Sequence, residues 1–266
     1  MEPETVHYST STEGITTITL DRAQRRNAVN PATATSLRNA FLRFEEDTTQ
    51  KVCVFHGANG TFCAGFDLHH LSQGDGQALN PSVGPVEGRN TGPMGPSRMT
   101  ISKPVICAVS GYAVAGGLEL SLLGDMRIVE EDAIFGVFCR RWGVPLIDGG
   151  TVRLQAIVGL GRAMDMILTG RPVGAQEALS MGLANRVVPK GKGLEEAMNV
   201  ARLIVGFPQM CTNLDRRSCY YAAYEATSLE DALKFECGNG LQAVAAEGKK
   251  GAGSFSQGKG RHGSML

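Results

Sequence analysis

Apolar residues alternate with threonines over Ile15–Leu20, and this period of two predicts a half-buried β-strand. Asn30 followed by Pro31 predicts the start of a helix, because asparagine caps a helix well and proline suits the first helical turn. Mostly apolar runs at 51–56 and 103–109 predict two further strands. The first half of the chain is therefore predicted to alternate strands and helices, as an α/β fold does.

After Gly150 the apolar residues recur at helical spacing. Helices with glycine stops are predicted at 151–158, 162–168, 175–181 and 194–207. Ser228, with Glu230 and Asp231 in the first turn, predicts the start of a last long helix. The tail after Ala246 is rich in Gly, Lys and Ser, so we expect it to be mobile.

The segment 72–97 differs from both halves, because it holds six Gly and four Pro with almost no periodicity. Loops of this length inside a compact domain usually act as lids or binding loops, or are disordered. We expect this loop to contribute to a substrate pocket.

Composition narrows the choice of function. The 266 residues carry 26 basic and 26 acidic side chains, and this zero net charge argues against nucleic acid or an anionic membrane as a partner. No apolar run is long enough to span a membrane. Seven scattered cysteines, without a C-x-x-C pair, are typical of reduced intracellular thiols, and the five histidines lack metal-ligand spacing, so no metal is expected.

The two ends of the chain bear on its location. Residues 1–4 are acidic and poor in apolar residues, so neither a secretory nor a mitochondrial presequence is visible. We therefore expect a cytoplasmic protein. The final Ser264-Met265-Leu266 loosely resembles the S-K-L peroxisomal address, which makes the peroxisome the alternative.

Two motifs about fifty residues apart carry the candidate chemistry, F-C-A-G-F-D at 62–67 and G-Y-A-V-A-G-G-L-E-L at 111–120. Each has small residues where a backbone N–H can face outward, and two converging N–H groups form an oxyanion hole. Glu119 follows Gly116 by three residues, about one helical turn. This pairing indicates an enzyme that acts on a carbonyl compound through an enolate-like intermediate.

Together with K-P-V-I-C-A-V-S ahead of the second motif and D-G-G-T-V-R-L at 148–154, these motifs resemble the crotonase (enoyl-CoA hydratase/isomerase) superfamily over about residues 10–250. The resemblance implies a spiral of ββα units with a CoA-thioester site over 1–200. It also implies a C-terminal helical trimerisation region and tail over 201–266. An acyl-CoA substrate, no separate cofactor, and a homotrimer or dimer of trimers are further implications.

The resemblance assigns the oxyanion hole to the N–H groups of Phe66 and Gly116, and the first catalytic acid to Glu119. The leucines around Glu119 predict that it is buried, so its pKa should be raised toward neutrality. The family's second hydratase glutamate falls on Cys139, which cannot readily replace a carboxylate that activates water. We expect Cys139 to be a small apolar filler rather than a nucleophile.

Asp148 is a second candidate acid, since some isomerases and dehydratases of the superfamily carry an acid in this segment. There it moves a proton along the acyl chain. The alternative role is an N-cap of the helix that begins near Gly149, and both roles are compatible.

The remaining expected contacts to substrate or CoA come from the segment before the first helix and from the two motifs. These residues are Arg26, Ala28, Ala64, Asp67, Leu68 and Gly117.

The leading hypothesis is hydration or double-bond isomerisation of an enoyl-CoA, with Glu119 and Asp148 favouring isomerisation. Cys139 motivates one alternative, a family member that binds CoA thioesters without turnover. A second alternative is a CoA-thioester dehalogenase or hydrolase with Asp148 as the nucleophile. An RNA-associated role is disfavoured by the zero net charge.

Overall fold

The computed structural model describes residues 4–73, 86–87 and 90–260. It contains two compact units, Met1–Ala201 and Arg202–Leu266. The terminal tripeptide 264–266 and most of the central loop at 74–85 and 88–89 lie outside the described residues.

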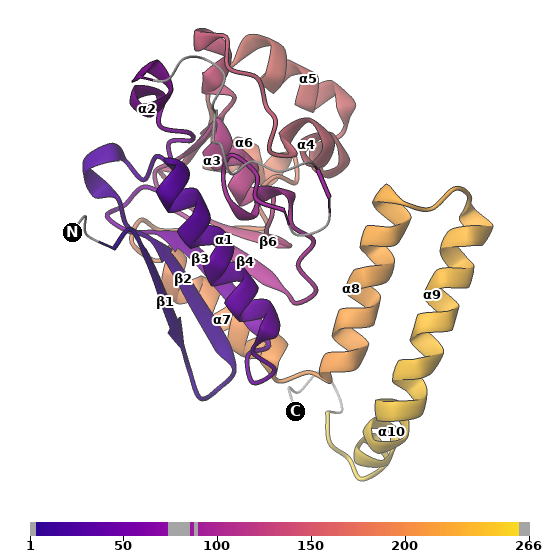
Figure 1. Cartoon of the computed structure of the whole chain (residues 1–266). Coiled ribbons are helices and arrows are strands. Elements are labelled where there is room, and N and C mark those ends of the chain that lie inside the picture. The colour runs from indigo at the N-terminus through magenta and orange to yellow at the C-terminus, as the bar shows by residue number, and fades with distance from the viewer. Residues whose placement is uncertain (1–3, 74–85, 88–89, 261–266) are drawn as a thin grey trace. The chain divides into compact units, whose positions relative to one another are not determined.

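The first unit is built on a six-stranded sheet with the order β1-β2-β3-β4-β6-β9 (Figure 1). The pairing of β1 with β2 is antiparallel, and every other pairing in this sheet is parallel. The strands are β1 (Val6–Thr10), β2 (Ile15–Leu20), β3 (Val52–Gly57), β4 (Val105–Val109), β6 (Met126–Glu130) and β9 (Arg186–Val188). A small second sheet contains β5 (Tyr112–Val114), β7 (Ile134–Gly136) and β8 (Val173–Gly174).

Helices and single 3₁₀ turns connect and follow these strands. The α-helices are α1 (Pro31–Glu46), α2 (Leu68–Gln73), α3 (Gly116–Ser121), α4 (Gly150–Val158), α5 (Leu160–Thr169), α6 (Ala175–Ser180) and α7 (Gly193–Val205). The 3₁₀ turns are η1 (Ala23–Arg25), η2 (Pro96–Arg98) and η3 (Phe138–Trp142). This alternation confirms the predicted α/β class.

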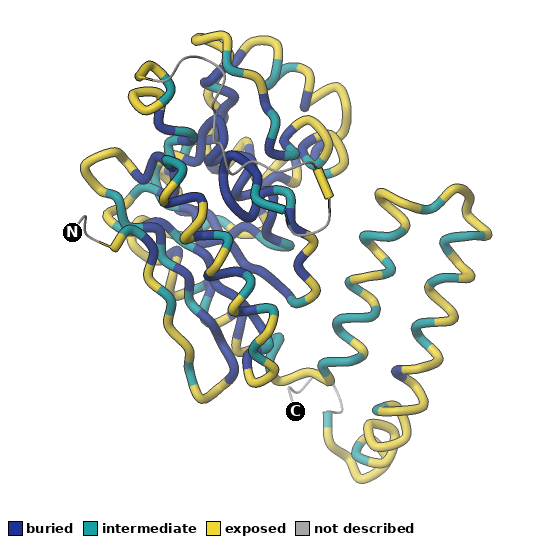
Figure 2. Tube along the Cα trace, viewed as in Figure 1, coloured by how far each residue is buried: buried dark blue, intermediate teal, exposed yellow. Residues whose placement is uncertain are grey.

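Helix α1 begins where the sequence predicts, because the Asn30 side chain accepts a hydrogen bond from Thr33 N at 2.9 Å. It lies across the sheet in Figure 1 and buries Leu37, Phe41 and Phe44 completely. Figure 2 shows the buried positions gathered between the sheet and the helices that cover it.

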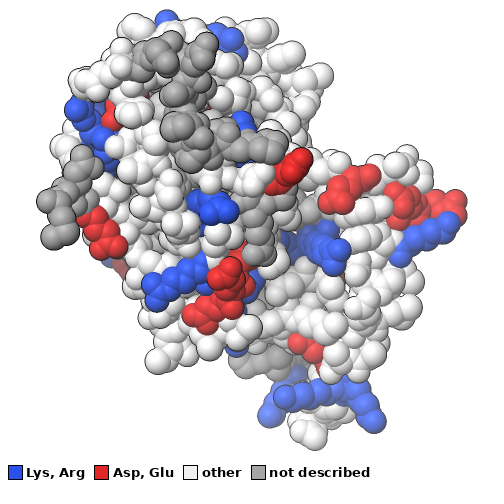
Figure 3. Space-filling model, viewed as in Figure 1, with Lys and Arg blue, Asp and Glu red and all other residues white. Residues whose placement is uncertain are grey.

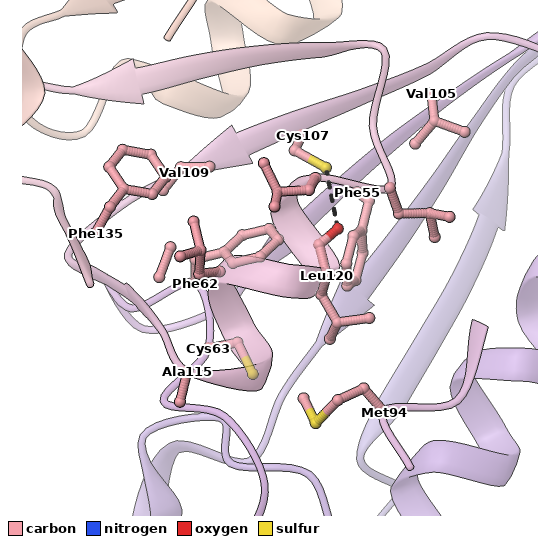
Figure 4. Close-up of a cluster of buried hydrophobic side chains, with 14 of the residues drawn as sticks. Phe55, Phe62, Cys63, Met94, Val105, Cys107, Val109, Ala115, Leu120 and Phe135 are labelled. Atoms are coloured by element: carbon pink, nitrogen blue, oxygen red, sulfur yellow. Dashed lines mark hydrogen bonds between the residues drawn. The ribbon is translucent and has the colours of Figure 1, made fainter. Parts of the chain in front are cut away.

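The motif at 62–67 is part of this core. Phe55 packs edge-on against Phe62 with ring centroids 5.2 Å apart. Figure 4 shows Phe62, Cys63 and Ala115 in one buried cluster with Leu120. Core packing therefore fixes the backbone that the candidate chemistry requires.

The second unit is helical, with α8 (Gln209–Tyr224), α9 (Leu229–Ala243), a π-helical turn at Val244–Gly248 and α10 (Lys249–Ser256). Ser228 caps α9 as predicted, and Tyr221 stacks on Phe235 with ring centroids 3.9 Å apart. The stretch from Val244 to Ser256 is helical, although its composition predicted no helix, and the mobility of the tail after Ala246 remains a prediction.

Candidate functional site

The two motifs run side by side. Cys63 N donates to the Tyr112 carbonyl at 2.8 Å, and Val114 N donates to the Cys63 carbonyl at 3.1 Å. Cys63 and Ala113 thus form a parallel bridge. The segment after β3 is therefore held against β5, immediately before the start of α3.

The N–H groups of Phe66 and Gly116 are both available. Val29 bonds to the residues on either side of Phe66, which in a parallel bridge turns the N–H of Phe66 the other way. Gly116 is the first residue of α3, where N–H groups lack a partner within the helix. Within the described ranges neither N–H donates to a protein acceptor.

Gly65 brings these two groups close together. Its φ of +98° suits glycine, and a Cβ built on it would lie only 3.1 Å from Gly116 N. The structure therefore brings Phe66 and Gly116 together as the sequence predicts, with the positive end of α3 beside them.

Ala115, the residue before this helix, has φ 54° and ψ −126°, a conformation that costs a non-glycine residue about 1–3 kcal/mol. Ala115→Gly should stabilise the protein by relieving this strain. It should also destabilise the protein, because a methyl contact is lost and the unfolded chain gains entropy. These effects oppose each other, so we expect the unfolding free energy to change by no more than about 0.5 kcal/mol. Ala113→Gly, at a buried position of negative φ, should cost about 1.5 kcal/mol. Chemical denaturation measures both, and equal losses would argue against strain at Ala115.

Glu119 is only 2% exposed, in the first turn of α3. Its Oε1 accepts hydrogen bonds from Asp148 N at 2.9 Å and from Gly150 N at 2.8 Å. Burial, followed by the charge of Asp148, raises the pKa of Glu119 to about 7. The predicted burial and the predicted rise of the pKa are therefore both present.

Asp148 is 3% exposed, and its Oδ1 accepts hydrogen bonds from Met94 N at 3.0 Å and from the Ser97 hydroxyl. Burial raises the pKa of Asp148, while the hydrogen bond from Ser97 opposes the rise. The N-cap alternative is wrong, because Gly149 occupies the cap of α4 and no side chain bonds there.

One cavity joins these groups. Glu119, Asp148, Phe66 and Gly116 all line it, as do Ala64 and Leu68 of the first motif. The rest of the lining is largely apolar and comprises Pro93, Met94, Ala115, Phe138, Cys139, Trp142, Val144, Pro145 and Ile147. An apolar cavity with two carboxylates and two neighbouring N–H donors suits a substrate that carries a carbonyl group.

Cys139 is 7% exposed and lines this cavity from η3. Burial, together with the charge of Glu119, raises the pKa of the Cys139 thiol. The thiol is therefore neutral near pH 7, as expected for a filler side chain rather than a nucleophile.

Other predicted contact residues have positions that suggest structural roles. Asp67 accepts a hydrogen bond from Arg22 Nη1 at 2.6 Å and another from His69 N at 3.1 Å, so its carboxylate stabilises the start of α2. Arg22 Nη1 also donates to the Ala28 carbonyl at 3.0 Å. Gly117 packs so closely that a Cβ would lie 2.0 Å from the Cys63 carbonyl oxygen.

Arg26 has a left-handed backbone, and its carbonyl accepts a hydrogen bond from Ala64 N at 3.1 Å. Arg26 and Ala28 do not line the cavity described above, so their contact with CoA remains a prediction. In the described part of the chain no group of three or more His, Cys, Asp and Glu side chains could hold a metal ion. No helix there is both long and apolar enough to cross a membrane.

Met94 and Ser97, which donate hydrogen bonds to Asp148, could not be identified from the sequence. Both lie in the aperiodic segment, which offered no signal beyond its length.

Figure 3 shows acidic and basic side chains interspersed over the face in view.

Comparison with known proteins shows which family this chain resembles. The family model for enoyl-CoA hydratase/isomerase matches residues 10–257. Enoyl-CoA hydratase EchA19 of Mycobacterium tuberculosis is 31% identical over 248 residues, covering 90% of this chain and 89% of that protein. Carnitinyl-CoA dehydratase of Proteus mirabilis is 31% identical over 228 residues, covering 85% and 84%. The crystal structure of an enoyl-CoA hydratase from Bacillus anthracis superposes with a TM-score of 0.87 at 27% identity, covering 96% of each chain.

Proposed function

Because this chain belongs to the enoyl-CoA hydratase/isomerase family, with the crotonase fold, we propose which groups of its cavity carry the reaction. The chain is an enzyme of the acyl-CoA hydratase/isomerase type. The thioester oxygen binds between the N–H groups of Phe66 and Gly116. These donors stabilise the charge that the oxygen gains when a proton leaves the acyl chain.

Glu119 and Asp148 exchange the protons. Both hydrogen bonds to Glu119 from described residues use Oε1, so we assign proton transfer to Oε2. Burial, followed by the charge of Asp148, raises the pKa of Glu119 to about 7, so Glu119 can both hold and release a proton near neutral pH. One of the two acids accepts a proton from the acyl chain of the substrate, while the other donates a proton to it. This exchange moves the double bond between the 3- and 2-positions.

The observation that carries this assignment is that two buried acids line one cavity with two N–H groups that bond to no described residue, while Cys139 stands where a second hydratase glutamate would be. The names of the dehydratase relatives favour a second candidate, reversible hydration with Glu119 as the main acid and base.

Asp148→Asn separates the two candidates, because the amide cannot exchange protons in the same way. We expect the variant to lose isomerisation of a 3-enoyl-CoA by about 10²-fold or more, since general acid–base catalysis contributes about 10²–10⁴-fold. A spectrophotometric assay with paired 2-enoyl- and 3-enoyl-CoA substrates measures this.

Hydration that survives Asp148→Asn but not Glu119→Gln would support the second candidate. Turnover of neither substrate by the wild-type protein would leave the non-catalytic alternative, and a trapped acyl-enzyme at Asp148 would indicate a hydrolase or dehalogenase.

We further propose that CoA enters as part of the substrate and that no step uses a separate cofactor. We also propose a homotrimer or dimer of trimers in the cytoplasm. Exposed leucines of α9, namely Leu229, Leu233 and Leu241, support contact with further copies, which light scattering of the full chain tests.

A further inference from the structure

The segment 92–98 approaches both halves of the cavity. Gly92 and Gly95 exchange two backbone hydrogen bonds of 2.9 Å, which closes a tight turn around Met94. A Cβ on Gly116 would lie 2.6 Å from Met94 Sδ, so the Met94 side chain packs over the glycine of the oxyanion hole. Its backbone N–H donates to Asp148.

Ser97 completes this arrangement. It is fully buried, and its hydroxyl donates to the same Asp148 Oδ1 that Met94 N uses. Its own carbonyl accepts a hydrogen bond from Arg153 Nη1 at 2.7 Å, and this nitrogen also lies 3.3 Å from the Asp148 carbonyl. Arg153 belongs to α4, so Ser97 and Asp148 are linked through both a side chain and a neighbouring helix.

We propose that Ser97 and Arg153 are positioning residues, which hold the Asp148 carboxylate in its place in the cavity. They keep Oδ1 occupied as a hydrogen-bond acceptor, so that it takes no part in proton transfer. This inference rests on the proposed function, in which Asp148 exchanges a proton with the substrate. It assigns the reacting oxygen of Asp148 to Oδ2, as Oε2 is assigned in Glu119.

The charges around Asp148 give the sign of the expected pH effect. Burial raises the pKa of Asp148, and the hydrogen bond from Ser97 opposes this rise most, followed by the hydrogen bond from Met94 N and the charges of Arg98 and Arg153. Glu119 is the acid that faces Asp148, and the charge of Asp148 raises its pKa. Below the acidic limb of the pH profile both acids are protonated and turnover is lost. Without the Ser97 hydroxyl, Asp148 holds its proton more tightly, so this limb moves to higher pH.

The test is the pH profile of kcat for 3-enoyl-CoA conversion by Ser97→Ala in the full chain. We expect the acidic limb to move up by about one pH unit and kcat to fall about tenfold, with KM within about threefold of the wild-type value. Ser97→Thr, which keeps the hydroxyl, should restore most of the limb position. Arg153→Gln should move the limb in the same direction, and it tests the inference even if Ser97→Ala fails to fold.

Ser121→Ala is the matched control, because Ser121 is equally buried but donates to the Leu118 carbonyl at 2.7 Å. It should lose comparable stability without moving the limb. The inference is overturned if Asp148→Asn is inactive while Ser97→Ala and Arg153→Gln keep the wild-type profile. Full activity of Asp148→Asn would overturn the proposed role of Asp148 itself, and the positioning role with it.

Discussion

Glu119→Gln is expected to lower kcat on an enoyl-CoA substrate by about 10³-fold, because it removes the main proton-exchanging group while the amide oxygen still accepts the hydrogen bonds at Oε1. In the wild-type enzyme kcat should fall as pH rises past about 7, where Glu119 loses its proton. Steady-state kinetics between pH 5 and 9 measures both effects. A variant with more than a tenth of wild-type kcat would assign the chemistry elsewhere.

The same substitution has an expected effect on stability that serves as its control. Burial raises the pKa of Glu119 from 4.5 to about 7. The contribution of Glu119 to the free energy of unfolding is therefore fully present below pH 4.5 and is lost as pH rises through about 7. At about 1.4 kcal/mol per pKa unit, this loss is about 3 kcal/mol. Glutamine carries no such charge, so Glu119→Gln should be at least as stable as the wild type at pH 8. A less stable variant there would make the loss of activity ambiguous.

Gly117→Ala is expected to have the largest effect on the assembled site. The new Cβ would lie 2.0 Å from the Cys63 carbonyl oxygen, a backbone atom that cannot move without separating the two motifs. We expect a loss of about 3 kcal/mol in unfolding free energy. A further loss of about 10²-fold in kcat should follow as the N–H groups of Phe66 and Gly116 move apart.

Gly161→Ala is the control for this substitution, because nothing lies within 4 Å of a Cβ built there in α5. Alanine should stabilise that helix by up to about 1 kcal/mol and leave kcat unchanged. Thermal unfolding and the enoyl-CoA assay compare the two variants. Wild-type kcat in Gly117→Ala would mean that the close approach of the motifs does not control catalysis.

Much of the fold could be predicted because local signals agree with tertiary packing. Asn30 and Ser228 cap helices in the structure as their sequence context indicates. Helix α8 was missed because none of its residues is buried within the chain, so no apolar face marked it. The short β5 was hidden inside a glycine-rich motif, where two or three residues give no readable period.

The site could be predicted in part. Phe66, Gly116 and Glu119 come from continuous motifs, and the structure brings them to one cavity. The direction of the Asp148 side chain could not be predicted, because its partners are about fifty residues away in a segment without periodicity. A cap and a cavity acid look alike in sequence, and only the fold distinguishes them.

In the proposed mechanism Phe66 has two independent roles. Its backbone N–H is the proposed donor to the thioester oxygen, and the residue also lines the cavity. Any residue other than proline supplies the same N–H, so a substitution at this position alters the shape of the wall and leaves the donor in place. Divergence of relatives toward new acyl groups can therefore proceed at residue 66 without rebuilding the machinery that stabilises the enolate.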